Sequence, residues 1–131
     1  MRQTDIVIAG GGLAGSLAAA MLGRAGIDAV LVDPHPVYPP DFRCEKLDDV
    51  QLRTLRLTGL ADAVTAASTP DQECWVVRQG CLVDKLPGGL QRGILYDTLV
   101  NTVRGQIPPS VEFINGKVMD VTTSADRKSV V

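Results

Sequence analysis

The sequence has little of what metal centres, disulfide frameworks and nucleophilic triads require. Its 131 residues include three cysteines and one histidine. Cys44, Cys74 and Cys81 are odd in number and lack Cys-x-x-Cys spacing, so we expect no metal site, no disulfide framework and a cytoplasmic protein. The histidine, His35, stands between two prolines. We interpret it as a surface-loop residue rather than as the base of a Ser-His-Asp triad.

Excess positive charge and unbroken hydrophobic runs are also absent. Thirteen Lys and Arg residues against fifteen Asp and Glu residues give a net charge of −2, which does not indicate nucleic-acid binding. The uncharged stretch over residues 6–23 is broken by glycines and is borderline in length for a membrane span. Its position after Arg2 has the outline of a secretory signal peptide, but Asp5, three consecutive glycines and the apolar run that follows argue against one. We expect no integral membrane segment.

The first 33 residues carry a pattern of strand, glycine turn, helix, strand and acid. The apolar run over residues 6–8 predicts a strand buried on both faces. After the glycine-rich segment 10–15, an Ala/Leu-rich helix runs to a terminal Gly26, and a second strand ends at Asp33. Apolar residues at helical spacing predict the buried face of the helix: Ala14, Leu17, Ala18, Met21 and Leu22. This order is the one that an ADP-containing dinucleotide requires.

Each position of the glycine motif has a physical reason. Gly10 permits a sharp turn, Gly12 lets the backbone approach a pyrophosphate, and Gly15 lets the helix pack closely on the strands. Backbone amides at the helix start, together with the helix dipole, favour phosphate binding. The carboxylate of Asp33 can accept hydrogen bonds from both ribose hydroxyls and would repel a 2′-phosphate. The motif therefore favours FAD or NAD over NADP.

The segment after Asp33 departs from a simple dehydrogenase. Four prolines over residues 34–40 prevent a helix and force an extended excursion. We then expect helices over about 48–57 and 60–67, an antiparallel hairpin of 73–78 with 82–86, a helix over about 91–104, and strands over 111–114 and 117–122. The Asn115-Gly116 pair allows either a two-residue hairpin turn or a tight bend. A β-meander in the crossover is unusual for NAD dehydrogenases.

Three segments resemble the FAD-dependent monooxygenases of the para-hydroxybenzoate hydroxylase type. Residues 5–33 follow the DxxIxGxGxxG fingerprint of that family almost position by position. Residues 43–47 stand where the family has an arginine-containing loop, and residues 92–99 resemble its RxxLxxxL helix start. The resemblance implies an α/β fold, with a Rossmann-like FAD-binding βαβ unit and a β-meander crossover.

The resemblance also implies which residues contact FAD. The pyrophosphate would be held by the motif glycines and the first helical amides, namely Gly10, Gly12, Leu13, Ala14 and Gly15. Asp33 would bind the adenosine ribose, while Arg43 and Arg92 would reach the phosphates or the ribityl chain, as suits a charged, forked guanidinium. A surface ion pair is the alternative interpretation of either arginine. No catalytic residue and no metal ligand is assigned.

The implied enzyme uses FAD, NAD(P)H as reductant and O2 to hydroxylate an aromatic or similar small molecule. Family members are longer, so we expect residues 1–131 to be an incomplete FAD/NAD(P)-binding domain without the substrate domain or the later FAD motif. Such a chain would be inactive alone, and its partner would be the remainder of its own chain or a second copy.

Related flavoproteins and non-enzymes stay open as alternatives. A geranylgeranyl-reductase-like reductase or a flavin-dependent halogenase would share the first βαβ unit. Halogenases need a Trp-rich motif downstream, and Trp75 is the only tryptophan here, so the sequence does not decide. A non-catalytic nucleotide-binding module is the third alternative.

Overall fold

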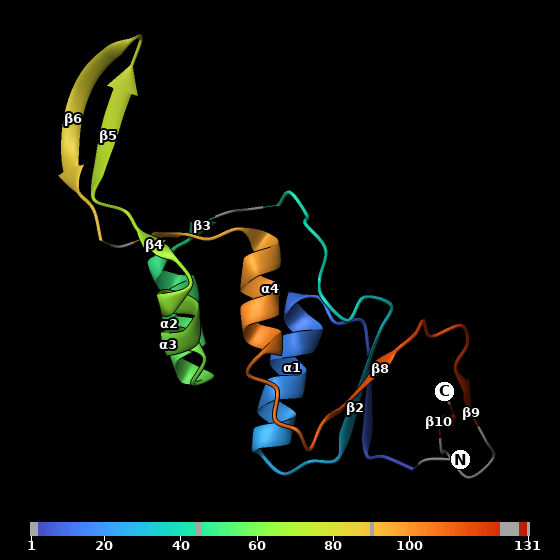
Figure 1. The fold of residues 1–131 in the computed structure, drawn as a ribbon. Coiled ribbons are helices and arrows are strands. Elements are labelled where there is room, and N and C mark those ends of the chain that lie inside the picture. The colour runs from blue at the N-terminus through green and yellow to red at the C-terminus, as the bar shows by residue number, and fades with distance from the viewer. Residues whose placement is uncertain (1–2, 44–45, 90, 124–128, 131) are drawn as a thin grey trace. The chain divides into compact units, whose positions relative to one another are not determined.

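The protein has a mixed α/β fold, shown as a computed structural model in Figure 1. The structure describes residues 3–43, 46–89, 91–123 and 129–130. The chain divides into two compact units. Unit 1 comprises Met1–Pro39 and Val103–Val131, and unit 2 comprises Pro40–Thr102. Unit 1 is therefore built from two separate stretches of sequence.

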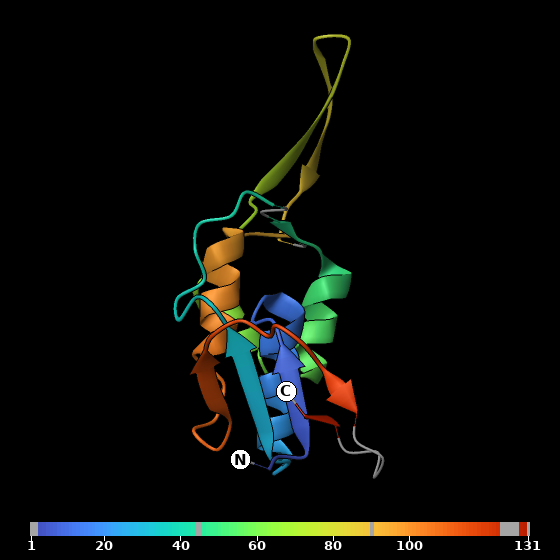
Figure 2. The ribbon, with the colours of Figure 1, turned by 90° about the vertical axis from the view of Figure 1, so that its right-hand side faces the viewer.

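Unit 1 contains a three-stranded parallel sheet in the order β1-β2-β8. These strands are β1 (Ile6–Ala9), β2 (Ala29–Asp33) and β8 (Glu112–Asn115), which lie side by side in Figure 2. Helix α1 (Leu13–Arg24) connects β1 to β2, and Gly26 follows it with a φ of +74°, a conformation that favours glycine. The predicted strand–turn–helix–strand order of the first 33 residues is thus present.

The buried face of α1 differs from the predicted one. The residues that α1 buries are small: Ser16, Ala19, Ala20 and Gly23. Met21, predicted to be in the core, is 45% exposed, whereas Leu22 is partly buried. The reason is close packing, because a Cβ added to Gly23 would lie 2.5 Å from the Val111 side chain. The small residues recur at positions three, four and seven apart, which is also a helical spacing.

The core of unit 1 lies between α1 and the sheet. Ala19, Ala29, Leu31 and Val111 form its buried centre, with Ile6, Ile8, Leu22 and Ile107 packed against it. The prediction that β1 is buried on both faces is wrong, because Val7 on its other face is 38% exposed. β1 is an edge strand of this sheet, whereas the central strand β2 is buried at four of its five positions.

Unit 2 begins with two short strands and two short helices. Its first elements are β3 (Lys46–Leu47), α2 (Asp49–Leu57), α3 (Ala61–Ala66) and β4 (Thr69–Pro70). The Asp48 side chain accepts a hydrogen bond from the Gln51 N–H, and the Gln51 side chain accepts one from the Asp48 N–H, so this pair stabilises the first turn of α2. A third strand, β7 (Arg92–Gly93), pairs with both β3 and β4 in an antiparallel sheet.

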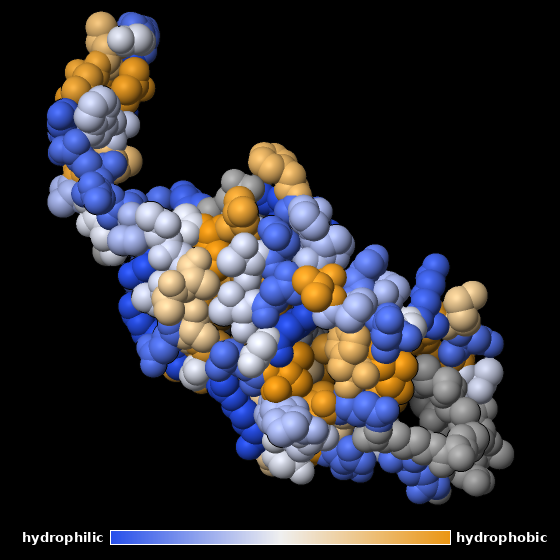
Figure 3. Space-filling model, in the orientation of Figure 1, coloured by the Kyte–Doolittle hydropathy of each residue, from blue (hydrophilic) through white to orange (hydrophobic). Residues whose placement is uncertain are grey.

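A hairpin follows β4, as predicted. Strands β5 (Glu73–Arg78) and β6 (Cys81–Pro87) are antiparallel and are joined at Gln79 and Gly80, both with positive φ. Hydrophobic side chains on both strands are exposed, as the orange atoms on the hairpin in Figure 3 show. These exposed residues are Trp75, Val77, Leu82, Val83 and Leu86. Cys74 and Cys81 are exposed free thiols.

Two predicted elements have different bounds in the structure. Helix α4 (Tyr96–Arg104) begins five residues after the predicted start, because Arg92 and Gly93 pair as strand β7. The predicted strand over 117–122 is wrong, since residues 117–121 form no strand. β9 (Thr122–Thr123) instead pairs with β10 (Ser129–Val130). Asn115 is the last residue of β8 and Gly116 forms a bend, so the pair is not a two-residue hairpin turn.

Two negative findings apply to the described part of the chain. None of its helices combines the length and apolar character that crossing a membrane requires. It also holds no group of three or more His, Cys, Asp and Glu side chains arranged to bind a metal ion.

Candidate dinucleotide-binding site

The glycine turn after β1 is held tightly against α1. Gly10 has a φ of +103°, and its N–H donates to the Val32 carbonyl at 2.8 Å. A Cβ added to Gly15 would lie 1.9 Å from the Gly10 carbonyl oxygen and 3.2 Å from the Ile8 side chain. Close approach of helix and turn therefore requires glycine at position 15.

Gly12 begins the helix and leaves space beside it. It is the N-cap of α1, and the first intrahelical N–H of the helix, that of Ser16, donates to its carbonyl at 2.9 Å. The N–H groups of residues 13–15 lie before the first intrahelical hydrogen bond and have no acceptor within the helix. No side chain caps this end of α1. A Cβ added to Gly12 would meet no described atom within 4 Å. The turn is thus open where an anionic ligand would approach a helix N-terminus.

Asp33 lies at the carboxyl end of β2, next to this turn. It is only 7% exposed. Its Oδ2 accepts a hydrogen bond from the Gly11 N–H at 2.7 Å, and its Oδ1 accepts one from the His35 N–H at 2.8 Å. Burial opposes ionisation, but these two hydrogen bonds and the guanidinium of Arg104 outweigh it and lower the pKa of Asp33. The site therefore presents a carboxylate.

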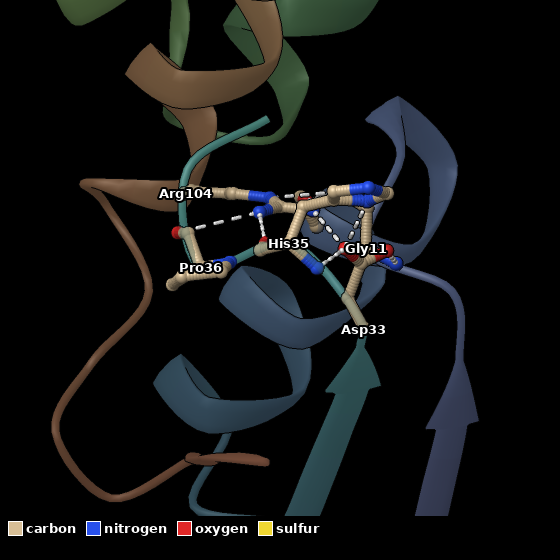
Figure 4. A network of polar contacts seen from close by, with 6 residues as sticks. Gly11, Asp33, His35, Pro36 and Arg104 are labelled. Atoms are coloured by element: carbon tan, nitrogen blue, oxygen red, sulfur yellow. Dashed lines mark hydrogen bonds and ion pairs between the residues drawn. The ribbon is translucent and has the colours of Figure 1, made fainter. Parts of the chain in front are cut away.

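Arg104, the last residue of α4, completes the contacts around Asp33 (Figure 4). Its Nη2 lies 3.2 Å from Asp33 Oδ1, and its Nε donates to the Gly11 carbonyl at 2.8 Å. Arg104 is not among the residues predicted from the sequence, because 93 positions separate it from Gly11. From the sequence, Arg104 is simply a basic residue in the last turn of a predicted helix. That position does not indicate a contact with the glycine turn.

Acid should weaken unit 1 through Asp33. Because its folded-state pKa lies below the unfolded value of about 3.9, its ionised form contributes stability that is lost as the pH falls through the folded pKa. We expect the free energy of unfolding, measured in urea at about pH 5.5 and about pH 3, to fall less in Asp33→Asn than in the wild type. Asp62→Asn, which changes an exposed carboxylate in α3, is the control. An unchanged pH slope in Asp33→Asn would contradict this role.

The two arginines expected at the cofactor both lie in unit 2. The Nε of Arg43 is 2.6 Å from Asp41 Oδ2, and its guanidinium lies 5.0 Å from the centroid of the Tyr96 ring. Arg92 donates to Ser68 Oγ at 3.2 Å and to the carbonyl of Thr65 at 3.3 Å. Unit 1 therefore brings the motif glycines and Asp33 together, while each arginine contacts neighbours within unit 2.

The fold and site define the class of the protein. A parallel sheet with a glycine turn after its first strand and an acid at the end of its second is typical of α/β proteins that bind dinucleotides. The profile of the family described as "FAD binding domain" matches residues 3–106, and the chain belongs to this family. This match confirms the resemblance to FAD-dependent hydroxylases noted from the sequence.

The curated relatives, matched over about half of the chain, are hydroxylases. The 3-(3-hydroxy-phenyl)propionate/3-hydroxycinnamic acid hydroxylase of Comamonas testosteroni is 38% identical over 68 residues, which cover 52% of this chain and 12% of the relative. The enzyme with the same name from Mycolicibacterium gilvum is 38% identical over 70 residues, again 12% of its length. The matched segment thus spans about an eighth of the length of these relatives.

Solved structures share the fold over nearly the whole chain. Pseudomonas aeruginosa PqsL in complex with 2-aminobenzoylacetate has a TM-score of 0.79 at 21% identity, covering 98% of this chain and 38% of PqsL. The p-nitrophenol 4-monooxygenase PnpA of Pseudomonas putida DLL-E4 has a TM-score of 0.76 at 21% identity, covering 91% and 33%. At this identity the likeness concerns the fold.

Proposed function

We propose that this chain is the FAD-binding portion of a flavoprotein monooxygenase that hydroxylates an aromatic or similar small molecule. The observation that carries the proposal is the pairing of an open glycine turn with a buried carboxylate at the ends of adjacent parallel strands, β1 and β2. Ligands of open α/β sheets bind at the carboxyl ends of the strands. In this proposal residues 1–131 form an FAD-binding domain of the Rossmann-like type with a β-meander crossover.

The residues of unit 1 fit the ADP half of FAD. Gly10, Gly12 and Gly15, with the amides of Leu13 and Ala14, would hold the pyrophosphate, because no side chain fills the space at Gly12. Asp33 would accept a hydrogen bond from the adenosine ribose. Arg43 and Arg92 would add positive charge toward the phosphates or the ribityl chain, with the fork geometry that phosphate oxygens accept.

Bound FAD supplies the redox chemistry, with NAD(P)H as reductant and O2 as oxidant, while the protein binds and orients it. The aromatic substrates in the names of the hydroxylase relatives support an aromatic substrate here. Because the chain spans only 12% of those relatives, we propose that substrate selection belongs to other parts of the protein. The 131-residue chain should therefore show no NAD(P)H oxidation at enzyme-like rates.

Calorimetric titration of the 131-residue chain tests the proposal. We expect ADP and FAD to bind and FMN, which lacks the adenosine, to give no detectable heat. Adenosine 2′,5′-bisphosphate should bind at least about tenfold more weakly than adenosine 5′-phosphate, because Asp33 would repel its 2′-phosphate. Absence of ADP binding, or FMN binding as tight as ADP binding, would overturn the assignment.

A further inference from the structure

We propose that Arg104 is a positioning residue of the dinucleotide site: it holds the Asp33 carboxylate so that one acceptor position stays open, and the adenosine ribose is bound through a single hydroxyl. The inference rests on the ADP site proposed above. It refines the expectation, drawn from the sequence, that Asp33 accepts hydrogen bonds from both ribose hydroxyls.

The carboxylate of Asp33 is already largely occupied by its own chain. A carboxylate offers about four lone-pair positions. The His35 N–H and the Arg104 guanidinium lie at 2.8 Å and 3.2 Å from Oδ1, and the Gly11 N–H lies at 2.7 Å from Oδ2. The imidazole Nδ1 of His35 also faces Oδ1, at 3.6 Å. Among the described residues these contacts leave one position on Oδ2 for a ligand.

The guanidinium of Arg104 is hydrogen-bonded to the backbone of its own chain. Besides the contact with Asp33, its nitrogens donate to the carbonyl oxygens of Gly11, His35 and Pro36 (Figure 4). All three nitrogens of the guanidinium therefore have an acceptor in unit 1. Arg104 is thus suited to orient Asp33 rather than to bind a phosphate itself.

Aromatic rings restrict the guanidinium further. Its central carbon lies 5.5 Å from the centroid of the Tyr38 ring and 5.6 Å from that of Phe113, within the range of cation–π attraction. The Arg104 side chain is only 8% exposed. Contacts from the loop after β2, from the glycine turn and from β8 therefore hold this arginine in one orientation.

The residue at position 11 also bears on the contact between Arg104 and Asp33. It occupies the position of the glycine motif at which any residue is allowed. Here a Cβ would lie 2.5 Å from Arg104 Nη2 and 3.0 Å from Asp33 Cβ. A side chain at position 11 would displace the guanidinium, so glycine at this position leaves room for Arg104 in the orientation that contacts Asp33.

Deoxynucleotides test the inference. The ligands to compare are ADP, 2′-deoxy-ADP and 3′-deoxy-ADP, and the proteins are the wild-type chain, Arg104→Met and a control, Arg56→Met. The control changes an exposed arginine in the last turn of α2. In the wild type, removal of one hydroxyl should weaken binding roughly tenfold or more, and removal of the other less than about threefold. Arg104→Met opens a second acceptor position and should bring the two losses within about threefold of each other.

Gly11→Ala provides a second test, because the added Cβ displaces the guanidinium while Arg104 is still present. It should weaken ADP binding in the wild type and have little further effect in Arg104→Met, because the displaced group is then absent. Gly116→Ala is its control, since a Cβ there meets only an ordinary contact at 3.8 Å. If Arg104→Met fails to fold, two comparisons still decide: the deoxynucleotide losses in the wild type, and the weaker ADP binding of Gly11→Ala relative to Gly116→Ala.

Three results would overturn the inference, and one would instead overturn the proposed function. Equal losses for the two deoxynucleotides in the wild type would exclude single-hydroxyl recognition. A parallel loss for all three nucleotides in Arg104→Met, with a lower melting temperature, would make the arginine structural only. Additive effects of Gly11→Ala and Arg104→Met would separate the two residues. No ADP binding by the wild type would refute the ADP site itself.

Discussion

Gly15→Ala should lower the free energy of unfolding by about 3 kcal/mol, the upper part of the usual range for overpacking. In an ordinary helix the same substitution raises the free energy of unfolding, because alanine is favoured over glycine by about 1 kcal/mol. The added Cβ would lie 1.9 Å from the Gly10 carbonyl oxygen. That oxygen belongs to the backbone, so relief requires a shift of the turn or of α1. Urea unfolding followed by circular dichroism measures the effect.

Gly12→Ala is the matched control for this substitution. It adds the same methyl group to the same motif, at a position where a Cβ meets no described atom within 4 Å. Its effect on the free energy of unfolding should stay below about 1 kcal/mol, the usual size of a change at a helix N-cap. A stable Gly15→Ala variant would mean that the helix and the turn are not as close as the structure shows.

Gly12→Val should have the reverse pattern, with folding retained and nucleotide binding lost. Its φ of −67° and ψ of −170° are extended and accessible to valine, so the free energy of unfolding should change by about 1 kcal/mol at most. Its branched side chain would project into the space in front of the helix amides. We expect the affinities for ADP and FAD to fall at least about 100-fold, because the pyrophosphate could no longer approach the backbone.

Calorimetry together with thermal unfolding checks the Gly12→Val prediction. An unchanged ADP affinity in a folded variant would contradict the pyrophosphate site. The glycines at positions 12 and 15 thus separate two roles that the sequence motif combines. In the proposed site Gly12 would leave room for the pyrophosphate, whereas Gly15 leaves room for the carbonyl oxygen of Gly10.

Local patterns in the sequence predicted most of unit 1. The apolar run before the glycines, Gly26 at the end of α1 and Asp33 at the end of β2 are short-range signals, and each is where it was expected. The buried face of α1 could not be predicted from hydrophobicity, because alanine, serine and glycine are buried there for their small size. The start of α4 was misplaced because the pairing of β7 with β3 overrides the local helical pattern.

The candidate site was predicted only as far as its contiguous part. The glycines and Asp33 are at most 23 residues apart, so one motif describes them. Arg104 and β8 come from a distant stretch, and their contacts with Asp33 and β2 are tertiary contacts without a sequence signature. The cofactor roles of Arg43 and Arg92 stay predictions.

The split of unit 1 into two stretches has a consequence for how the chain can change in length. Residues 40–102 form an insertion between β2 and the returning segment that ends in β8. The entropy of closing a loop grows only with the logarithm of its length, by about 0.6 kcal/mol for each doubling. Lengthening a flexible part of the insertion would therefore cost the parallel pairing of β2 with β8 little stability. The length of the segment between β2 and β8 could therefore change during evolution while the parallel sheet of unit 1 kept its stability.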